Sequence, residues 1–349
     1  MVTVSGFGEP ISTAKQATDE ADMTIQMVLA EHKLYQKLIS SCSFRARKSQ
    51  RTSLSDDSKD PAKSVYIESD FRVRMKEGDA FVEFQSPRDI RVYEEDATPG
   101  LKNTRYEFDP TPISQRLVIS QGTVAYWSDL EVPLIDVYEE DAWKKANEHD
   151  RFEKRHRRTF SVDPRYVVTE VMPGFSFSRF FEDKLAKGQQ WSTSQDTDIT
   201  KPENLVLERR GVSQNYINAL VYLHDSNFII ACAQSFPAEG KIASEYRVSY
   251  MIVDGIPFPE QMEYVRFDKD GTKTLMTRVR YEDVEINPVD NERIDMNSLD
   301  FPDGTYLVWH LPSSEQVKIS KNGTIEDSTE NPMSIRHLRD YPIAEAAKP

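Results

Sequence analysis

The stretch EYRVSYMIVDGIPFPEQMEYVRFDKDGTKTLMTRVRY, residues 245–281, decides the fold. Its first part alternates between two sets of side chains, as in a β-strand whose successive residues point to opposite faces. One face would carry Tyr246, Val248, Tyr250 and Ile252, and the other Arg247, Ser249, Met251 and Val253. Strict alternation over this length predicts a strand with one well-buried face.

Two turns divide the stretch into three strands. Asp254 and Gly255 begin the first turn, and Asp270 and Gly271 belong to the second. Asp-Gly pairs supply the positive φ that a tight hairpin needs. We therefore expect an antiparallel meander, hydrophobic on one side and cationic or polar on the other.

Strands of the same kind are predicted on either side of this meander. A long alternating strand spans residues 64–76, and shorter ones fit residues 80–85, 90–93, 105–108, 115–120 and 123–128. Further strands fit residues 166–171, 205–210, 217–224 and 228–233, the last apolar on both faces and therefore central. Such short spacings, with turn residues between them, predict one extended antiparallel sheet.

Three segments have helical patterns instead. Apolar residues at three- and four-residue spacing predict a helix over 19–42, with His32 on its apolar stripe. A Phe-rich helix is predicted over 175–187, and a solvated helix within an insertion at about 134–165. The fold class is α+β: a large, twisted antiparallel sheet with helices covering its concave face.

The domain organisation follows from these elements. Residues 1–18 carry no periodic apolar pattern and are expected to form a flexible lead-in. Residues 19–326 are expected to form a single domain, and residues 327–349 a C-terminal tail.

Composition and charge exclude several classes of protein. The 349 residues carry a formal net charge of −14, so nucleic acid is not an expected partner. No stretch approaches the roughly 20 apolar residues of a membrane span. Two cysteines are too few for a disulfide framework and are expected to be buried thiols.

Recognisable catalytic motifs are absent from the sequence. It contains no glycine-rich phosphate loop, no Cys-x-x-Cys and no Gly-x-Ser-x-Gly. Cys232 lies in an apolar strand, where a thiol is inert, and His32 is expected to be a core residue rather than a metal ligand. A weak candidate for a metal site is one face of the predicted helix, which carries His149, Glu153 and His156. The basic run 154–158 is interpreted as a helix C-terminus rather than a binding patch. We expect no catalytic residue, no bound metal and no cofactor, so the protein is not expected to be an enzyme.

The apolar face of the sheet leaves two functions open. Helices that cover it incompletely would leave a pocket for an apolar or lipid-like ligand. The candidate ligand-binding residues of such a cavity are Val65, Ile67, Phe71, Val73, Tyr246, Val248, Tyr250 and Ile252. Helices that cover the face completely would make the protein a protein-interaction or scaffold module with a filled core.

The order of elements resembles the outer-membrane lipoprotein carriers of the LolA/LolB-like family. The likeness rests on LISSCSFR at residues 38–45, LVISQGTVAYW at 117–127, DKDG at 268–271 with RYEDVEIN at 280–287, and FPDGT at 301–305. It implies an incomplete β-barrel around helices, an acyl-chain ligand in the concavity and no enzymatic activity. It also implies the periplasm or cell envelope of a bacterium, a genuine cytosolic start at Met1 being the alternative.

Overall fold

The computed structural model describes most of the predicted sheet. It describes residues 11–53, 64–77, 79–87, 91–94, 104–107, 112–120, 122–128, 134–139, 162–173, 175–178, 190–195, 204–210, 217–224, 228–236, 241–288, 293–311, 313–332 and 335. Within these residues, 16 strands follow the order β11-β12-β13-β14-β15-β16-β17-β1-β2-β3-β6-β7-β8-β18-β19-β20. The strand order has two ends, so the described strands form an open sheet. The predicted α+β fold with a large sheet is confirmed.

The chain divides into two compact units, and the boundary falls within β17. Unit 1 contains Met1–Ile39 and Asp163–Arg278, and unit 2 contains Ser40–Val162 and Val279–Pro349. The prediction that residues 19–326 fold as a single domain stays a prediction.

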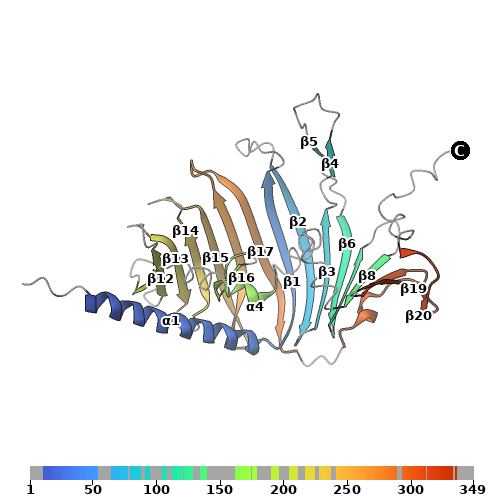
Figure 1. The fold of residues 1–349 in the computed structure, drawn as a ribbon, viewed down its shortest axis with the longest axis horizontal. Helices are drawn as coiled ribbons and strands as arrows, with labels where there is room; N and C mark the ends of the chain where they lie inside the picture. Colours follow the sequence, from blue (N-terminus) through green and yellow to red (C-terminus); the bar gives the residue numbers. More distant parts are fainter. Residues whose placement is uncertain are drawn as a thin grey trace, which may run out of the picture. The chain divides into compact units, whose positions relative to one another are not determined.

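Unit 1 is built on an antiparallel meander (Figure 1). Its strands are β11 (Gln190–Gln195), β12 (Asn204–Arg210), β13 (Ile217–His224), β14 (Ile230–Ser235), β15 (Ser244–Val253), β16 (Ile256–Phe267) and the beginning of β17 (Lys273–Ile286). Both predicted turns have the expected backbone, with φ of +51° at Asp254, +79° at Gly255 and +83° at Gly271. The sequence thus predicts the meander correctly.

The helix α1 (Ile11–Leu38) packs one face on unit 1. Ile25 and Val28 are fully buried on this face. His32 Nε2 donates to the carbonyl oxygen of Phe228 over 2.8 Å, and the Tyr35 hydroxyl donates to that of Pro257 over 2.7 Å. The helix begins at Ile11 rather than at residue 19, so the predicted flexible lead-in is too long.

A second layer of unit 1 is formed by residues 163–177, which are mostly buried. They comprise α4 (Pro164–Val167), β9 (Glu170–Met172) and β10 (Phe175–Ser176). The carbonyl of Val168 accepts a hydrogen bond from the amide of Ile230 in β14 over 3.0 Å. The predicted start of the Phe-rich helix is wrong, because Phe175–Ser176 pairs with β9 as a strand; residues 179–189 lie outside the described residues.

Unit 2 continues the strand order from the end of β17. Its strands are β1 (Ser41–Ser53), β2 (Ser64–Lys76), β3 (Asp79–Pro87), β6 (Pro112–Ser120), β7 (Thr123–Ser128), β8 (Leu134–Glu139), β18 (Tyr306–His310), β19 (Glu315–Lys321) and β20 (Thr324–Asp327). A separate hairpin joins β4 (Arg91–Glu94) to β5 (Thr104–Glu107), and the 3-10 helix η2 spans Met296–Leu299.

Two predictions about unit 2 need correction. Strands β8 and β18 pair in parallel, so the sheet is mixed rather than purely antiparallel. A long crossover between them, from residue 139 to residue 306, makes a parallel pair feasible. The predicted helical insertion at 134–165 is wrong at its start, because Leu134–Glu139 is β8; residues 140–161 lie outside the described residues.

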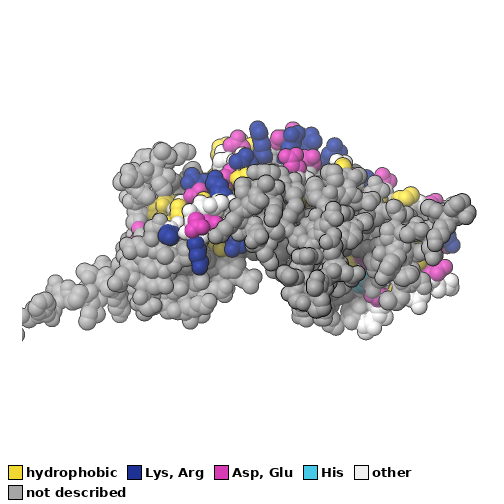
Figure 2. Space-filling view, turned by 90° about the horizontal axis from the view of Figure 1, so that it is seen from above, with side chains coloured by type: hydrophobic (Ala, Val, Ile, Leu, Met, Phe, Trp, Pro, Cys, Tyr) yellow, Lys and Arg dark blue, Asp and Glu magenta, His cyan; other side chains and the backbone are white. Residues whose placement is uncertain are grey.

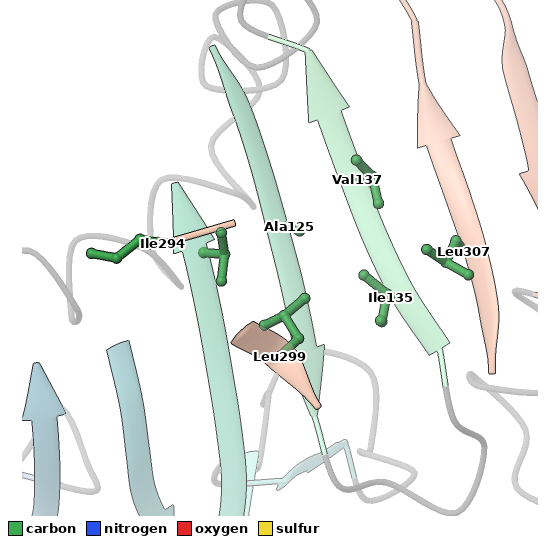
Figure 3. Packing of buried hydrophobic residues seen from close by; sticks show 7 residues of the cluster. Ala125, Ile135, Val137, Ile294, Leu299 and Leu307 are labelled. Atoms are coloured by element: carbon green, nitrogen blue, oxygen red, sulfur yellow. The ribbon is translucent and has the colours of Figure 1, made fainter. Parts of the chain in front are cut away.

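The strands β6, β7, β8 and β18 of unit 2 bury both faces. One face carries a cluster of Val118, Ala125, Ile135, Val137, Ile294, Leu299 and Leu307 (Figure 3). The other carries Leu134, Val308, Val317 and Ile335. Ile335 is only 2% exposed, so the segment predicted as a tail contributes to this core.

The outward face of β1, β2 and the end of β17 is charged, as the alternation predicts. Arg45 lies 3.6 Å from Asp283, and Arg47 lies 3.7 Å from Asp70. Figure 2 shows Lys and Arg side chains interspersed with Asp and Glu side chains on one face of the molecule. Exposed ion pairs of this kind contribute little to stability. Because positive and negative side chains are interspersed, the described part of this face carries no patch of a single charge sign.

Among the described helices, none has the length and hydropathy needed to cross a bilayer.

Candidate ligand-binding pocket

A pocket of about 180 Å³ lies in unit 2 beside the buried cluster of β6, β7, β8 and β18. Its lining consists of Val118, Ser120, Thr123, Ala125, Asp295, Met296 and Trp309. The strand register explains how these residues meet. Val118 is paired with Ala125, and Val137 is paired with both Ala125 and Trp309, so one row crosses four strands. Residues directly opposite one another share a face of a sheet.

The end of the pocket nearest the β6–β7 turn is polar. Ser120 is paired with Thr123 across the turn, two residues beyond Val118 and Ala125 along their strands. Because side chains two residues apart share a face, both hydroxyl residues lie on the same side as the apolar row. The pocket therefore combines an apolar floor with hydroxyl groups at one end.

The 3-10 helix η2 supplies the remaining residues of the lining. Asp295 caps it by accepting a hydrogen bond from the amide of Asn297 over 2.9 Å, and the Ser298 side chain completes the capping box. Arg116 in β6 donates to the carbonyl oxygens of Leu299 over 2.7 Å and Asp300 over 3.2 Å. Leu299 is fully buried over the cluster (Figure 3). The cap, the arginine and the buried leucine fix η2 at the edge of the pocket.

The predicted ligand residues of β15 do not line this pocket. Tyr246 is fully buried, and its hydroxyl donates to the carbonyl oxygen of Val167 over 2.7 Å, so residues 163–177 occupy its surroundings. Val248 is 6% exposed, whereas Ile252 is 69% exposed. Ile252 is exposed at the end of β15, two residues before the turn at Asp254, and the register shift between Ser249 and Tyr250 skips Glu260 of β16.

The predicted ligand residues of β2 belong to unit 2. Phe71 and Val73 are buried, Ile67 is half-buried, and the side chain of Val65 lies outside the described residues. Phe71 stacks on Phe84 of β3, with ring centroids 5.5 Å apart. The two groups of predicted residues thus fall in different units, and their common role in one cavity stays a prediction.

A buried histidine on the opposite face of β8 and β18 is the most polar feature of this region. His310 Nε2 lies 3.0 Å from Asp136 Oδ1, and Nδ1 lies 3.1 Å from Glu315 Oε1. The ring stacks on Tyr138, with centroids 4.1 Å apart. Each ring nitrogen thus lies within hydrogen-bonding distance of a carboxylate from a neighbouring strand, so the group joins β8, β18 and β19. None of these residues lines the pocket.

His32 and Cys232 are both expected to be buried; His32 is buried, whereas Cys232 is half-buried. His32 is a core residue, and its burial lowers the pKa of the imidazole to about 4 against the opposing effect of the hydrogen bond to Phe228. Burial raises the pKa of the Cys232 thiol to about 12, with a further contribution from Glu245. A thiol that stays protonated is a poor nucleophile.

No group of three or more His, Cys, Asp or Glu residues suited to a metal ion occurs in the described part of the chain. His149, Glu153, His156 and the basic run 154–158 lie outside it.

The pocket residues were not predicted as a site. Residues 115–120 and 123–128 were correctly predicted as a hairpin, but nothing local indicates that Trp309 and Met296 join them. The Asp-x-x-Ser spacing of Asp295 and Ser298, a capping signal, is the one local pattern that could have marked η2.

Comparisons with known proteins find solved structures of low similarity. No protein-family model and no curated protein matches the chain. A DUF1329 family protein from Desulfovibrio piger matches with a TM-score of 0.34 and 10% identity over 78% of this chain and 98% of its own. A putative outer membrane lipoprotein-sorting protein domain from Vibrio parahaemolyticus matches with a TM-score of 0.34 and 11% identity over 76% and 93%.

A LolA superfamily protein from Nitrosomonas europaea matches with a TM-score of 0.33 and 13% identity over 78% of this chain and 98% of its own. The names of the structures from Vibrio parahaemolyticus and Nitrosomonas europaea fall within the family that the sequence resembles. Likeness at this level does not reveal what the chain binds.

Proposed function

We propose that this protein is a non-catalytic binding protein that holds an apolar group of a ligand in the pocket of unit 2. The observation that carries the proposal is the row Val118, Ala125 and Trp309, which provides an apolar floor beneath η2. Among the described lining residues there is no histidine or cysteine that could act as a base or a nucleophile. The one acid, Asp295, caps η2.

The volume of the pocket limits the ligand. Pockets for drug-sized molecules measure roughly 300–1,000 Å³, whereas an apolar cavity of about 150 Å³ binds benzene. At about 180 Å³, this pocket has room for one aromatic ring or the end of an acyl chain. A lipid-like ligand would therefore place only its terminus here.

Fluorobenzene followed by ¹⁹F NMR tests the proposal. We expect saturable binding to the wild-type chain and its loss in Thr123→Phe, because the larger side chain fills the pocket from the strand next to the turn. Thr324→Phe makes the same chemical change on the exposed strand β20 and should leave binding intact. The proposal fails if the wild-type chain shows no saturable binding, or if both variants bind as the wild type does.

A scaffold function is the second candidate, and the packing of unit 1 favours it. There the buried face of β15 is covered by residues 163–177 of the same chain, and Tyr246 is tied to them by a hydrogen bond. Native mass spectrometry after gentle purification separates the two functions. Co-purified lipid would support the carrier, whereas a clean apo mass together with failed fluorobenzene binding would support the scaffold.

The cell envelope is the compartment that we propose for either function. Support comes from the resemblance to outer-membrane lipoprotein carriers, which work there. Fractionation of the source organism with an antibody to this chain tests it: recovery in the periplasmic or envelope fraction is expected, and recovery in the cytosol alone would contradict it.

A further inference from the structure

The helix α1 has a second apolar face, directed away from the core of unit 1. Met27, Leu34 and Leu38 are 50%, 52% and 53% exposed. In contrast, Ile25, Val28, His32 and Tyr35 are at most 5% exposed on the inner face. The helix is therefore apolar on two sides, although only one side packs against its own unit.

Helical geometry places the exposed residues in one stripe. Successive residues are about 100° apart around the helix axis, so Met27, Leu34 and Leu38 fall within about 40° of one another. Ala30 lies on the same side of the helix. Large exposed hydrophobic residues elsewhere in the described chain, Tyr166, Ile252 and Ile325, lie on three separate elements. We call Met27, Ala30, Leu34 and Leu38 the outer stripe.

The outer stripe has lysines on one flank and an acid on the other. Lys33 and Lys37 are exposed on the same flank, whereas Glu31 is half-buried on the other. The other acids of α1, Asp19, Glu20 and Asp22, precede the outer stripe in the sequence. The C-terminal half of α1 thus presents apolar side chains with two exposed lysines on one flank and one half-buried acid on the other, in a chain whose net charge is −14.

We propose that the outer stripe docks on the surface of a lipid bilayer that contains anionic headgroups. A helix that lies on a bilayer presents apolar residues to the acyl boundary and lysines to the headgroups, as the outer stripe and the flank with Lys33 and Lys37 do. Because the Debye length is about 8 Å at physiological ionic strength, acids elsewhere in the chain are largely screened from this contact. The proposal does not rest on the pocket of unit 2.

Vesicle flotation with the full chain tests the docking. We expect the chain to float with vesicles of phosphatidylcholine and phosphatidylglycerol, and less with phosphatidylcholine alone. The triple variant Met27→Gln, Leu34→Gln, Leu38→Gln should lose about tenfold or more of the bound fraction, because it removes the apolar contact. Since these side chains are already half-exposed, the variant should keep the wild-type thermal stability.

A matched control changes exposed apolar residues outside α1. Ile252→Gln with Ile325→Gln should float like the wild type, and Lys33→Gln with Lys37→Gln should lose the preference for phosphatidylglycerol. Absence of wild-type flotation overturns the proposal, as does an equal loss in the control. A wild-type dimer that the triple variant converts to monomer, measured by sedimentation, would instead identify a second copy of the chain as the occupant. Fluorobenzene binding by the triple variant is expected to remain, which separates a failure of docking from a failure of the pocket.

Discussion

Acidification should destabilise unit 1 through His32. The imidazole is 5% exposed and donates from Nε2 to the carbonyl oxygen of Phe228, and burial lowers its pKa from 6.5 to about 4. Between these values the unfolded chain binds a proton that the folded chain does not. The stabilising contribution is therefore complete above pH 6.5 and is lost as the pH falls toward 4.

The expected loss follows from the separation of the two pKa values. Each unit of that separation corresponds to about 1.4 kcal/mol of unfolding free energy. Acidification through this range should therefore remove about 3 kcal/mol through His32 alone. That is a large fraction of the roughly 5–15 kcal/mol by which native proteins are stable.

Urea unfolding of the wild-type chain and of His32→Gln at a series of pH values measures this contribution. Glutamine can still donate to Phe228, but it does not titrate, so the other titrating groups cancel in the difference between the two proteins. The wild type should lose about 3 kcal/mol more than the variant as the pH falls. Parallel pH profiles would refute the reasoning, because they would show that His32 binds protons equally in both states.

Three further perturbations test other contacts. Tyr246→Phe leaves the buried carbonyl of Val167 without its donor and should cost about 1–2 kcal/mol in urea unfolding; an unchanged midpoint would show that the bond does not hold residues 163–177. A double-mutant cycle of His310→Ala and Asp136→Asn should give a coupling of about 1 kcal/mol or more, and additive effects would contradict a direct bond between β8 and β18. The Cys232 thiol, with its pKa of about 12, should not react with a thiol reagent near neutral pH until the chain unfolds; rapid reaction of the folded chain would contradict the burial.

The meander could be predicted from sequence because its signals are local. The alternation of β15 up to Ser249 and the turns at Gly255 and Gly271 are set by neighbouring residues. In the third strand, Val279 and Tyr281 are buried and Arg278 is exposed, as the period of two requires.

Contacts between distant parts of the chain could not be predicted in this way. The parallel pairing of β8 with β18 joins residues near 136 to residues near 308, and residues 163–177 fill the space beneath β15. Neither arrangement leaves a local pattern. Ile252 is likewise exposed at the end of β15, although the sequence alternates through it without interruption.

In the candidate site, too, the local part could be predicted from the sequence and the contacts between distant segments could not. Val118 and Ala125 lie on a predicted hairpin, so their common face follows from the sequence. Trp309 reaches them only through the parallel pair, and Met296 only through the bonds that Arg116 makes to the end of η2. Periodicity along the sequence does not reveal a pocket assembled from three remote segments. It identifies only the most regular strands, and the predicted ligand residues therefore lie on those strands.

The pocket of unit 2 is proposed as an apolar binding site, and one measurement decides whether it is. A crystal of the full chain pressurised with xenon tests this proposal most directly, because an apolar cavity of about 150 Å³ binds xenon. We predict xenon density in contact with Val118, Ala125 and Met296, between η2 and the β6–β7 hairpin. Ordered water or a neighbouring side chain in that position, with no xenon, would contradict the claim.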